Sequence, residues 1–137
     1  MTTRLNPYIS FNGNARQAME FYEGVFGGTL RLNTFGEFGA QDSADAEKIM
    51  HASLETTSGY TLMGADTPSG MEHNPGNNIA VSLGGDDADE LRGYWEKLSD
   101  AGTVSVPLEK QMWGDEFGMC VDKFGVGRMV NIAQPQA

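Results

Sequence analysis

The sequence predicts an α+β fold built from two tandem units, each in the order strand, helix, strand, strand, strand. The first observation behind this prediction is a pair of strand–turn–strand segments of similar shape, residues 51–66 and 116–132. The second is an amphipathic segment with helical spacing in each half, because residues 14–25 align with residues 87–98 without a gap. Two such units cannot bury their sheet faces separately, so we expect them to form one domain.

A segment rich in turn-forming residues divides the chain. Residues 67–78, TPSGMEHNPGNN, show no apolar periodicity. We therefore predict a single domain over residues 1–137, in which unit one spans about 4–66, the linker about 67–77 and unit two about 78–134.

The elements of unit one follow from local signals. A strand is predicted over residues 5–12, and Asn14 with Gln17 three residues later forms a capping-box pattern that opens a helix. The apolar stripe of this helix consists of Ala15, Ala18, Met19, Tyr22, Val25 and Phe26. A second strand over residues 29–37, a mobile loop over 38–47 and the first hairpin complete the unit.

Unit two repeats this order. A strand is predicted over residues 78–84, and Asp86-Asp87 caps a helix that carries Leu91, Tyr94, Trp95 and Leu98. Val104, Val106 and Leu108 then alternate as a strand, and the second hairpin follows.

Composition excludes several classes of function. The chain has 137 residues, a net charge of −10 and nine scattered Lys and Arg residues, so a nucleic-acid partner is not expected. No apolar run approaches the roughly 18 residues that span a bilayer, and the N-terminus lacks the apolar core of a signal peptide, so we expect no membrane partner and a cytoplasmic location. The single cysteine, Cys120, is expected to be a buried apolar residue within a strand.

The order of elements resembles the vicinal oxygen chelate superfamily of glyoxalases, extradiol dioxygenases and bleomycin-resistance proteins. The segment SFNGNARQAMEFYEGVFGG at residues 10–28, the His51-Ala52 pair and the closing WGDEFGMCVDKFGVGRMVNI are similar to its PhnB-like branch. The resemblance implies a glyoxalase-like fold of cupped mixed sheets with the helices outside and a pocket within the cup. It also implies a homodimer, and in metal-dependent members a divalent metal held by His, Glu or Gln.

The strongest chemical candidate is His51, because an imidazole is both a common metal ligand and a base with a pKa near operating pH. The alternative is a buried histidine hydrogen-bonded across the cup. Strand alternation places Ser53 and Glu55 on the same face, with Glu55 as a second catalytic candidate or a solvated residue. At the positions where the family carries metal ligands, the first strand offers Tyr8 and the last strand Met129, which leaves His51 as the metal-ligand candidate.

An apolar wall for a ligand pocket is also predicted. Its candidates are Tyr8, Met63, Trp113, Phe117 and Met129, with Ser53 as a polar neighbour, although each could instead belong to the core. Polar residues around Trp113 place this side chain near a rim. Arg128, in an apolar run, either faces solvent or holds an anionic ligand, and we expect solvent.

Two functional hypotheses follow, and the residues leave open whether the protein is an enzyme. The first is a small-molecule pocket containing His51 that supports metal-assisted chemistry on a substrate with neighbouring oxygens, as the resemblance implies. The second is a protein that sequesters a drug or metabolite without a metal, for which the acidic net charge would suit a cationic ligand. A cofactor is accordingly either one divalent metal or none.

Overall fold

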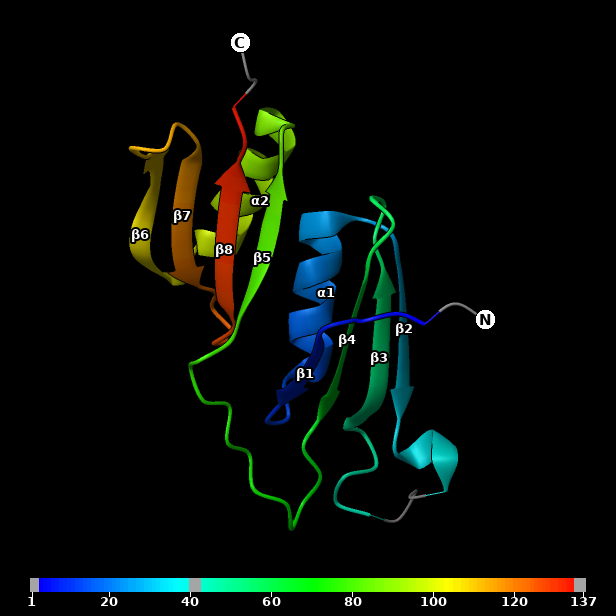
Figure 1. Cartoon of the computed structure of the whole chain (residues 1–137). Helices are drawn as coiled ribbons and strands as arrows, with labels where there is room; N and C mark the ends of the chain where they lie inside the picture. Colours follow the sequence, from blue (N-terminus) through cyan, green and yellow to red (C-terminus); the bar gives the residue numbers. More distant parts are fainter. Residues whose placement is uncertain (1–2, 40–42, 135–137) are drawn as a thin grey trace. The chain divides into compact units, whose positions relative to one another are not determined.

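The chain folds into two βαβββ units, as predicted from the sequence. The computed structural model describes residues 3–39 and 43–134, and unit 1 ends at Pro75 while unit 2 begins at Gly76 (Figure 1). Each unit holds one four-stranded mixed sheet and one helix of 12 residues. The α+β class and the repeat are therefore confirmed.

Unit 1 contains β1 (Tyr8–Phe11), α1 (Ala15–Phe26), β2 (Thr29–Thr34), β3 (Ile49–Glu55) and β4 (Thr61–Asp66). The strand order is β1-β4-β3-β2, with β1 parallel to β4 and the other pairs antiparallel. Helix α1 packs against β2, β3 and β4 (Figure 1). Its predicted apolar stripe is buried against one face of the sheet, where Ala52, Leu54 and Leu62 are also buried.

The start of α1 differs from the capping box expected at Asn14. The Asn14 side chain makes no capping hydrogen bond, and Asp66 takes its place. Asp66 Oδ1 accepts hydrogen bonds from the backbone N–H groups of Gly13 and Ala15, both at 2.9 Å, and Oδ2 accepts one from Ile49, also at 2.9 Å. One buried carboxylate thus joins the end of β4 to the starts of α1 and β3.

Strand β2 ends earlier than predicted. It stops at Thr34, and the 3₁₀ turn η1 (Gly36–Phe38) follows, in which the Glu37 N–H donates to Thr34 Oγ1. Of the loop predicted over residues 38–47, positions 40–42 lie outside the described residues. Asp45, near its end, accepts hydrogen bonds from the backbone N–H and the hydroxyl of Ser69.

Unit 2 contains β5 (Ala80–Gly85), α2 (Ala88–Ser99), β6 (Thr103–Lys110), β7 (Glu116–Val121) and β8 (Gly127–Ile132). Its strand order, β5-β8-β7-β6, matches that of unit 1, and β5 is parallel to β8. The predicted cap of α2 is confirmed, because Asp87 Oδ1 accepts a hydrogen bond from the Glu90 N–H. Cys120 is buried as expected, and this burial raises the pKa of its thiol.

The expectation that Arg128 faces solvent is wrong. Its side chain is 1% exposed, and Nε donates to Asp122 Oδ2 at 3.2 Å. Asp122 Oδ1 also accepts the backbone N–H groups of Phe124 and Val126, which form the turn between β7 and β8. Because Arg128 alternates with the buried Val130 and Ile132, it belongs to the buried side of its strand.

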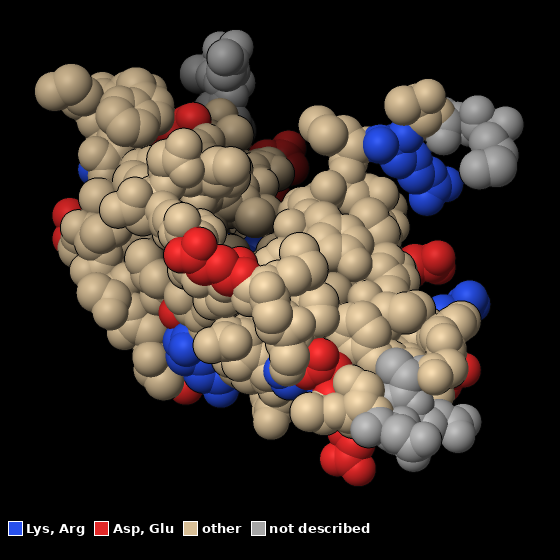
Figure 2. All heavy atoms as spheres, turned by 90° about the horizontal axis from the view of Figure 1, so that it is seen from below, with Lys and Arg blue, Asp and Glu red and all other residues tan. Residues whose placement is uncertain are grey.

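Charge and helix length bear on possible partners. On the face seen in Figure 2, Lys and Arg side chains are scattered singly among acidic and uncharged residues. Over residues 3–39 and 43–134, no helix is both long enough and apolar enough to cross a bilayer.

Candidate functional site

The candidate site lies on the face of the unit 1 sheet that α1 does not cover, here called the helix-free face. One row of side chains across this face follows the strand register: Tyr8 on β1 pairs with Met63 on β4, Met63 with Ser53 on β3, and Ser53 with Arg31 on β2. The adjoining positions on the same face are Ser10, Ala65, His51 and Asn33. The register thus brings four of the predicted residues, Tyr8, His51, Ser53 and Met63, onto one surface.

A hydrogen bond joins two of them. Tyr8 Oη lies 3.1 Å from His51 Nδ1, and the two ring centroids are 5.7 Å apart. The Tyr8 side chain spans β4 to reach β3, and the intervening position on this face is the small Ala65. The pair places a phenol and an imidazole side by side on an otherwise uncharged part of the face.

The protonation of this pair follows from burial. Desolvation raises the pKa of the Tyr8 phenol, so the hydroxyl keeps its proton at neutral pH. When this O–H donates to His51 Nδ1, the imidazole carries its own proton on Nε2. In this tautomer Nε2–H makes no hydrogen bond to any residue that the structure describes, so it is a donor available to a ligand.

Glu55, the other catalytic candidate, lies further along β3. It lies four positions after His51, which at the rise of a β-strand places their Cα atoms about 13 Å apart. Glu55 pairs with Thr29 and Thr61 near the hairpin turn and is exposed. The two side chains therefore belong to the same face but not to one constellation.

The three remaining predicted residues lie in unit 2. The rings of Trp113 and Phe117 are 6.1 Å apart, and Trp113, in the loop between β6 and β7, is 60% exposed. Met129 pairs with Ser82 on one side and Met119 on the other. These residues make an apolar surface within unit 2.

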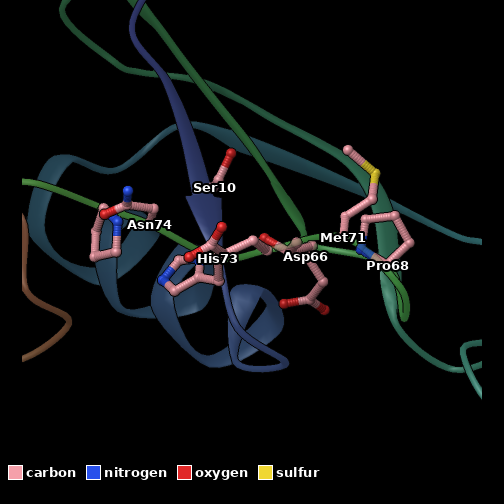
Figure 3. A pocket seen from close by; sticks show the side chains of 9 residues that line it. Ser10, Asp66, Pro68, Met71, His73 and Asn74 are labelled. Atoms are coloured by element: carbon pink, nitrogen blue, oxygen red, sulfur yellow. Dashed lines mark hydrogen bonds between the residues drawn. The ribbon is translucent and has the colours of Figure 1, made fainter.

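A hollow of about 250 Å³ that sequence reasoning missed lies beside β1 in unit 1 (Figure 3). Its wall is formed by Ser10, Asp66 and residues 67–75 apart from Ser69 and Gly70. The Thr67 hydroxyl and His73 Nδ1 lie 3.3 Å apart, which ties the two ends of this wall together. The composition of residues 67–75 indicated a linker. The only sequence signal for a fixed conformation was the pair of proline residues, one near each end of this segment.

Asp45 anchors this wall from the loop before β3. The hydrogen bonds from the Ser69 hydroxyl, at 2.7 Å, and from Lys48 and the Ser69 N–H lower the pKa of Asp45 to about 2. The carboxylate is therefore ionised throughout the physiological range, and the loop and the linker segment stay joined.

The donor chemistry of the helix-free face does not fit a resident metal ion. Within the described parts of the chain, no three His, Cys, Asp or Glu side chains gather into a group that could hold a metal. On this face His51 is the one imidazole, its Nδ1 contacts Tyr8, and Glu55 is too far along the strand to share an ion with it. In unit 2, Met129 on β8 offers a thioether and no carboxylate.

Comparisons with known proteins agree with this architecture. Residues 4–129 match the family model of the Glyoxalase/Bleomycin resistance protein/Dioxygenase superfamily. Protein YjdN of Escherichia coli strain K12 is 29% identical to the chain, covering 96% of it and 97% of YjdN. The crystal structure of protein PA1353 from Pseudomonas aeruginosa is 34% identical, with a TM-score of 0.84 over 98% of this chain and 100% of that one.

A further structural neighbour is the PhnB protein from Bacillus cereus, which is 22% identical with a TM-score of 0.73. It covers 96% of this chain and 100% of its own, and at this identity it shows the shared fold. The family match over most of the chain, the two βαβββ units and the PhnB-like neighbour lead to one conclusion: the chain belongs to the glyoxalase/bleomycin resistance protein/dioxygenase superfamily.

Proposed function

We propose that this protein binds a small molecule on the helix-free face of unit 1 and recognises it through the Tyr8–His51 pair, without a metal ion held by the protein. The observation that carries the proposal is the 3.1 Å hydrogen bond between Tyr8 Oη and His51 Nδ1, which, with Tyr8 as the donor, leaves Nε2–H as a donor to a ligand. A few positioned polar groups beside apolar side chains are typical of ligand pockets. Met63 and Ala65 supply the apolar part here.

The choice of binding over metal-assisted chemistry rests on the donor set. A metal that activates a substrate needs several ligands around one point, and this face supplies one imidazole. The family's name includes bleomycin-resistance proteins, which are a precedent for binding in other members of the family.

A catalytic role for the same pair is the second candidate. A tyrosine hydroxyl bonded to an imidazole is a short proton-transfer chain, so His51 could give the proton on Nε2 to a substrate while Nδ1 takes the proton of the Tyr8 hydroxyl, which the phenolate then regains from solvent. Catalysis would make the product differ from the added compound, whereas binding returns the compound unchanged. Product analysis by mass spectrometry after incubation separates the two functions.

The direct test screens the full chain, purified without an affinity tag, against a metabolite and antibiotic library by thermal shift. Hits are then titrated against the wild type, Tyr8→Phe and His51→Ala. We expect ligand binding that weakens about tenfold in either variant, because each loses a hydrogen bond to the ligand or to its partner. Tyr60→Phe is the matched control, since it removes a phenol hydroxyl from an exposed tyrosine that packs edge-on against Phe26.

Elemental analysis of the same preparations tests the metal part of the proposal. About one equivalent of a divalent metal in the wild type, lost in His51→Ala, would overturn it in favour of a metal enzyme. Equal affinity of the wild type and both site variants for every hit would place the binding site elsewhere.

The family resemblance also supports a homodimer. Sedimentation equilibrium of the full chain is expected to give twice the 14.8 kDa mass of one chain. A monomer at micromolar concentration would contradict this part of the proposal.

A further inference from the structure

One cation on the helix-free face has no counter-charge. Arg31 is exposed on β2 at the end of the row that runs through Ser53 and Met63 to Tyr8. Among the residues the structure describes, the Arg31 side chain makes no hydrogen bond and no ion pair. By contrast, Lys48 of the same unit is held by Asp45 at 3.0 Å.

The neighbours of Arg31 on this face carry hydrogen-bond donors. Ser53 is directly opposite Arg31 and contributes a hydroxyl, and Asn33 pairs with His51 one step along the face, where its Nδ2 donates to Glu37 Oε2 at 3.2 Å. His51 Nε2–H is a further donor in the tautomer set by Tyr8. A guanidinium, a hydroxyl and an imidazole N–H on one surface form the donor set that suits an oxyanion.

We propose that the ligand of this face carries an anionic oxygen group, a carboxylate or a phosphonate, which is bound by Arg31 and Ser53. This inference rests on the proposed function, because it names the ligand class of the same face. The uncharged body of the ligand then lies over Met63 and Ala65, between Arg31 and Tyr8. Arg31 is on this account a specificity-determining residue.

Three sources of negative charge oppose an anion, and the first is Glu37, whose carboxylate accepts a hydrogen bond from Asn33. Glu55 lies on the same face, one row nearer the hairpin turn, and pairs with Thr29 and Thr61 instead of Arg31. The net charge of −10 acts over the whole molecule, but at physiological ionic strength it is screened beyond about 8 Å. Contact with Arg31 therefore decides affinity, while Glu55 reduces it.

The test uses three probes that share a phenyl ring and differ in the charged group: benzoate, phenylphosphonate and benzylamine. Each is titrated into the ¹⁵N-labelled full chain, and backbone amide shifts in the ¹H–¹⁵N spectrum give both the site and the dissociation constant. The two anions are expected to shift the amides of Arg31, Ser53 and Met63. Benzylamine is expected to leave them unchanged.

Variants then assign the effect to single charges. Arg31→Gln is expected to weaken both anions about tenfold, the loss of one charge-assisted hydrogen bond. Glu55→Gln is expected to tighten them severalfold, since a repelling carboxylate is gone. Arg16→Gln is the matched control, because Arg16 is an exposed arginine of unit 1 on α1 and its loss is expected to change neither affinity.

Two results would overturn the inference. In the first, the anions shift the helix-free face equally in the wild type and Arg31→Gln, so Arg31 does not bind them. In the second, benzylamine shifts these amides and the anions do not. The second result would leave the proposed binding function intact, because it still locates a ligand on this face. If the library screen gave no hit and none of the three probes bound, that outcome would count against both the binding function and the anionic ligand.

Discussion

The carboxylate of Asp66 is predicted to be a major local source of stability in unit 1. It is 4% exposed and accepts three backbone N–H groups, those of Gly13, Ala15 and Ile49, each at 2.9 Å. Loss of a helix cap costs about 1–2 kcal/mol, and a buried N–H left without its acceptor costs about 1–3 kcal/mol. Asp66→Ala should therefore lower the free energy of unfolding by about 3 kcal/mol.

Asp66→Asn refines this prediction. Its amide oxygen can still accept from Gly13 and Ala15 at the start of α1, but its NH₂ group would face the Ile49 N–H, donor against donor. We expect a loss of about 1–2 kcal/mol, between wild type and Asp66→Ala.

Urea denaturation followed by circular dichroism measures these losses, and hydrogen exchange at Ala15 and Ile49 locates them. Asp87→Ala is the reference, since Asp87 caps α2 with one hydrogen bond to the Glu90 N–H and should cost about 1 kcal/mol. If Asp66→Ala cost no more than Asp87→Ala, the three-bond account of this carboxylate would be refuted.

Three further perturbations test other parts of the structure. Gly28→Ala should destabilise the protein by about 3 kcal/mol, because the φ of Gly28 is +107° and an added Cβ would lie 1.9 Å from the Glu55 carbonyl oxygen. Gly24→Ala in α1 is the contrast, since a Cβ there meets no atom within 4 Å and the substitution should stabilise the protein by about 0.5–1 kcal/mol. Urea denaturation measures both changes. The contribution of Asp45 to stability should be present above the ordinary carboxyl pKa and lost as pH falls through about 2, and Ser69→Ala should raise the pKa of Asp45 in an NMR titration. Asp122→Ala should cost about 3–5 kcal/mol by leaving its buried arginine partner uncompensated, and adding Arg128→Met should recover part of that loss.

Each of these has a contrary outcome. Equal effects of alanine at positions 24 and 28 would mean that the chain around Gly28 relaxes freely. An unchanged Asp45 pKa in Ser69→Ala would show that Ser69 does not hold the carboxylate. If the Asp122→Ala, Arg128→Met double variant were no more stable than Asp122→Ala alone, an uncompensated charge would not be the cause of the loss.

The elements were predictable from the sequence because their signals are local. The stripe of α1, the cap of α2 at Asp87 and the two hairpins all depend on residues a few positions apart. The cap of α1 was not predictable in this way, since Asp66 lies 51 residues from Ala15 and Asn14 offers the commoner local alternative. Only the pairing of β1 with β4 brings Asp66 to the helix.

The position of Arg128 follows the strand alternation and not the usual preference of arginine for solvent. A charged side chain is seldom buried, which favoured solvent. Its alternation with Val130 and Ile132 indicated the buried side, and Asp122 six residues earlier supplied the counter-charge. Similarly, Tyr8 and His51 were each predicted to line a pocket, but their hydrogen bond joins strands 43 residues apart and follows only from the register.

The two units share one plan but differ in the chemistry of the face that their helix leaves uncovered. In unit 1 this face carries Tyr8, His51, Ser53 and Arg31, a set of hydrogen-bond donors around Met63. The corresponding strands of unit 2 place Met129 between Ser82 and Met119. Because positioned polar groups fix the orientation of a ligand, the selectivity of the proposed site on unit 1 should come from these donors. Substitutions at Arg31 or His51 should therefore change which ligand is bound.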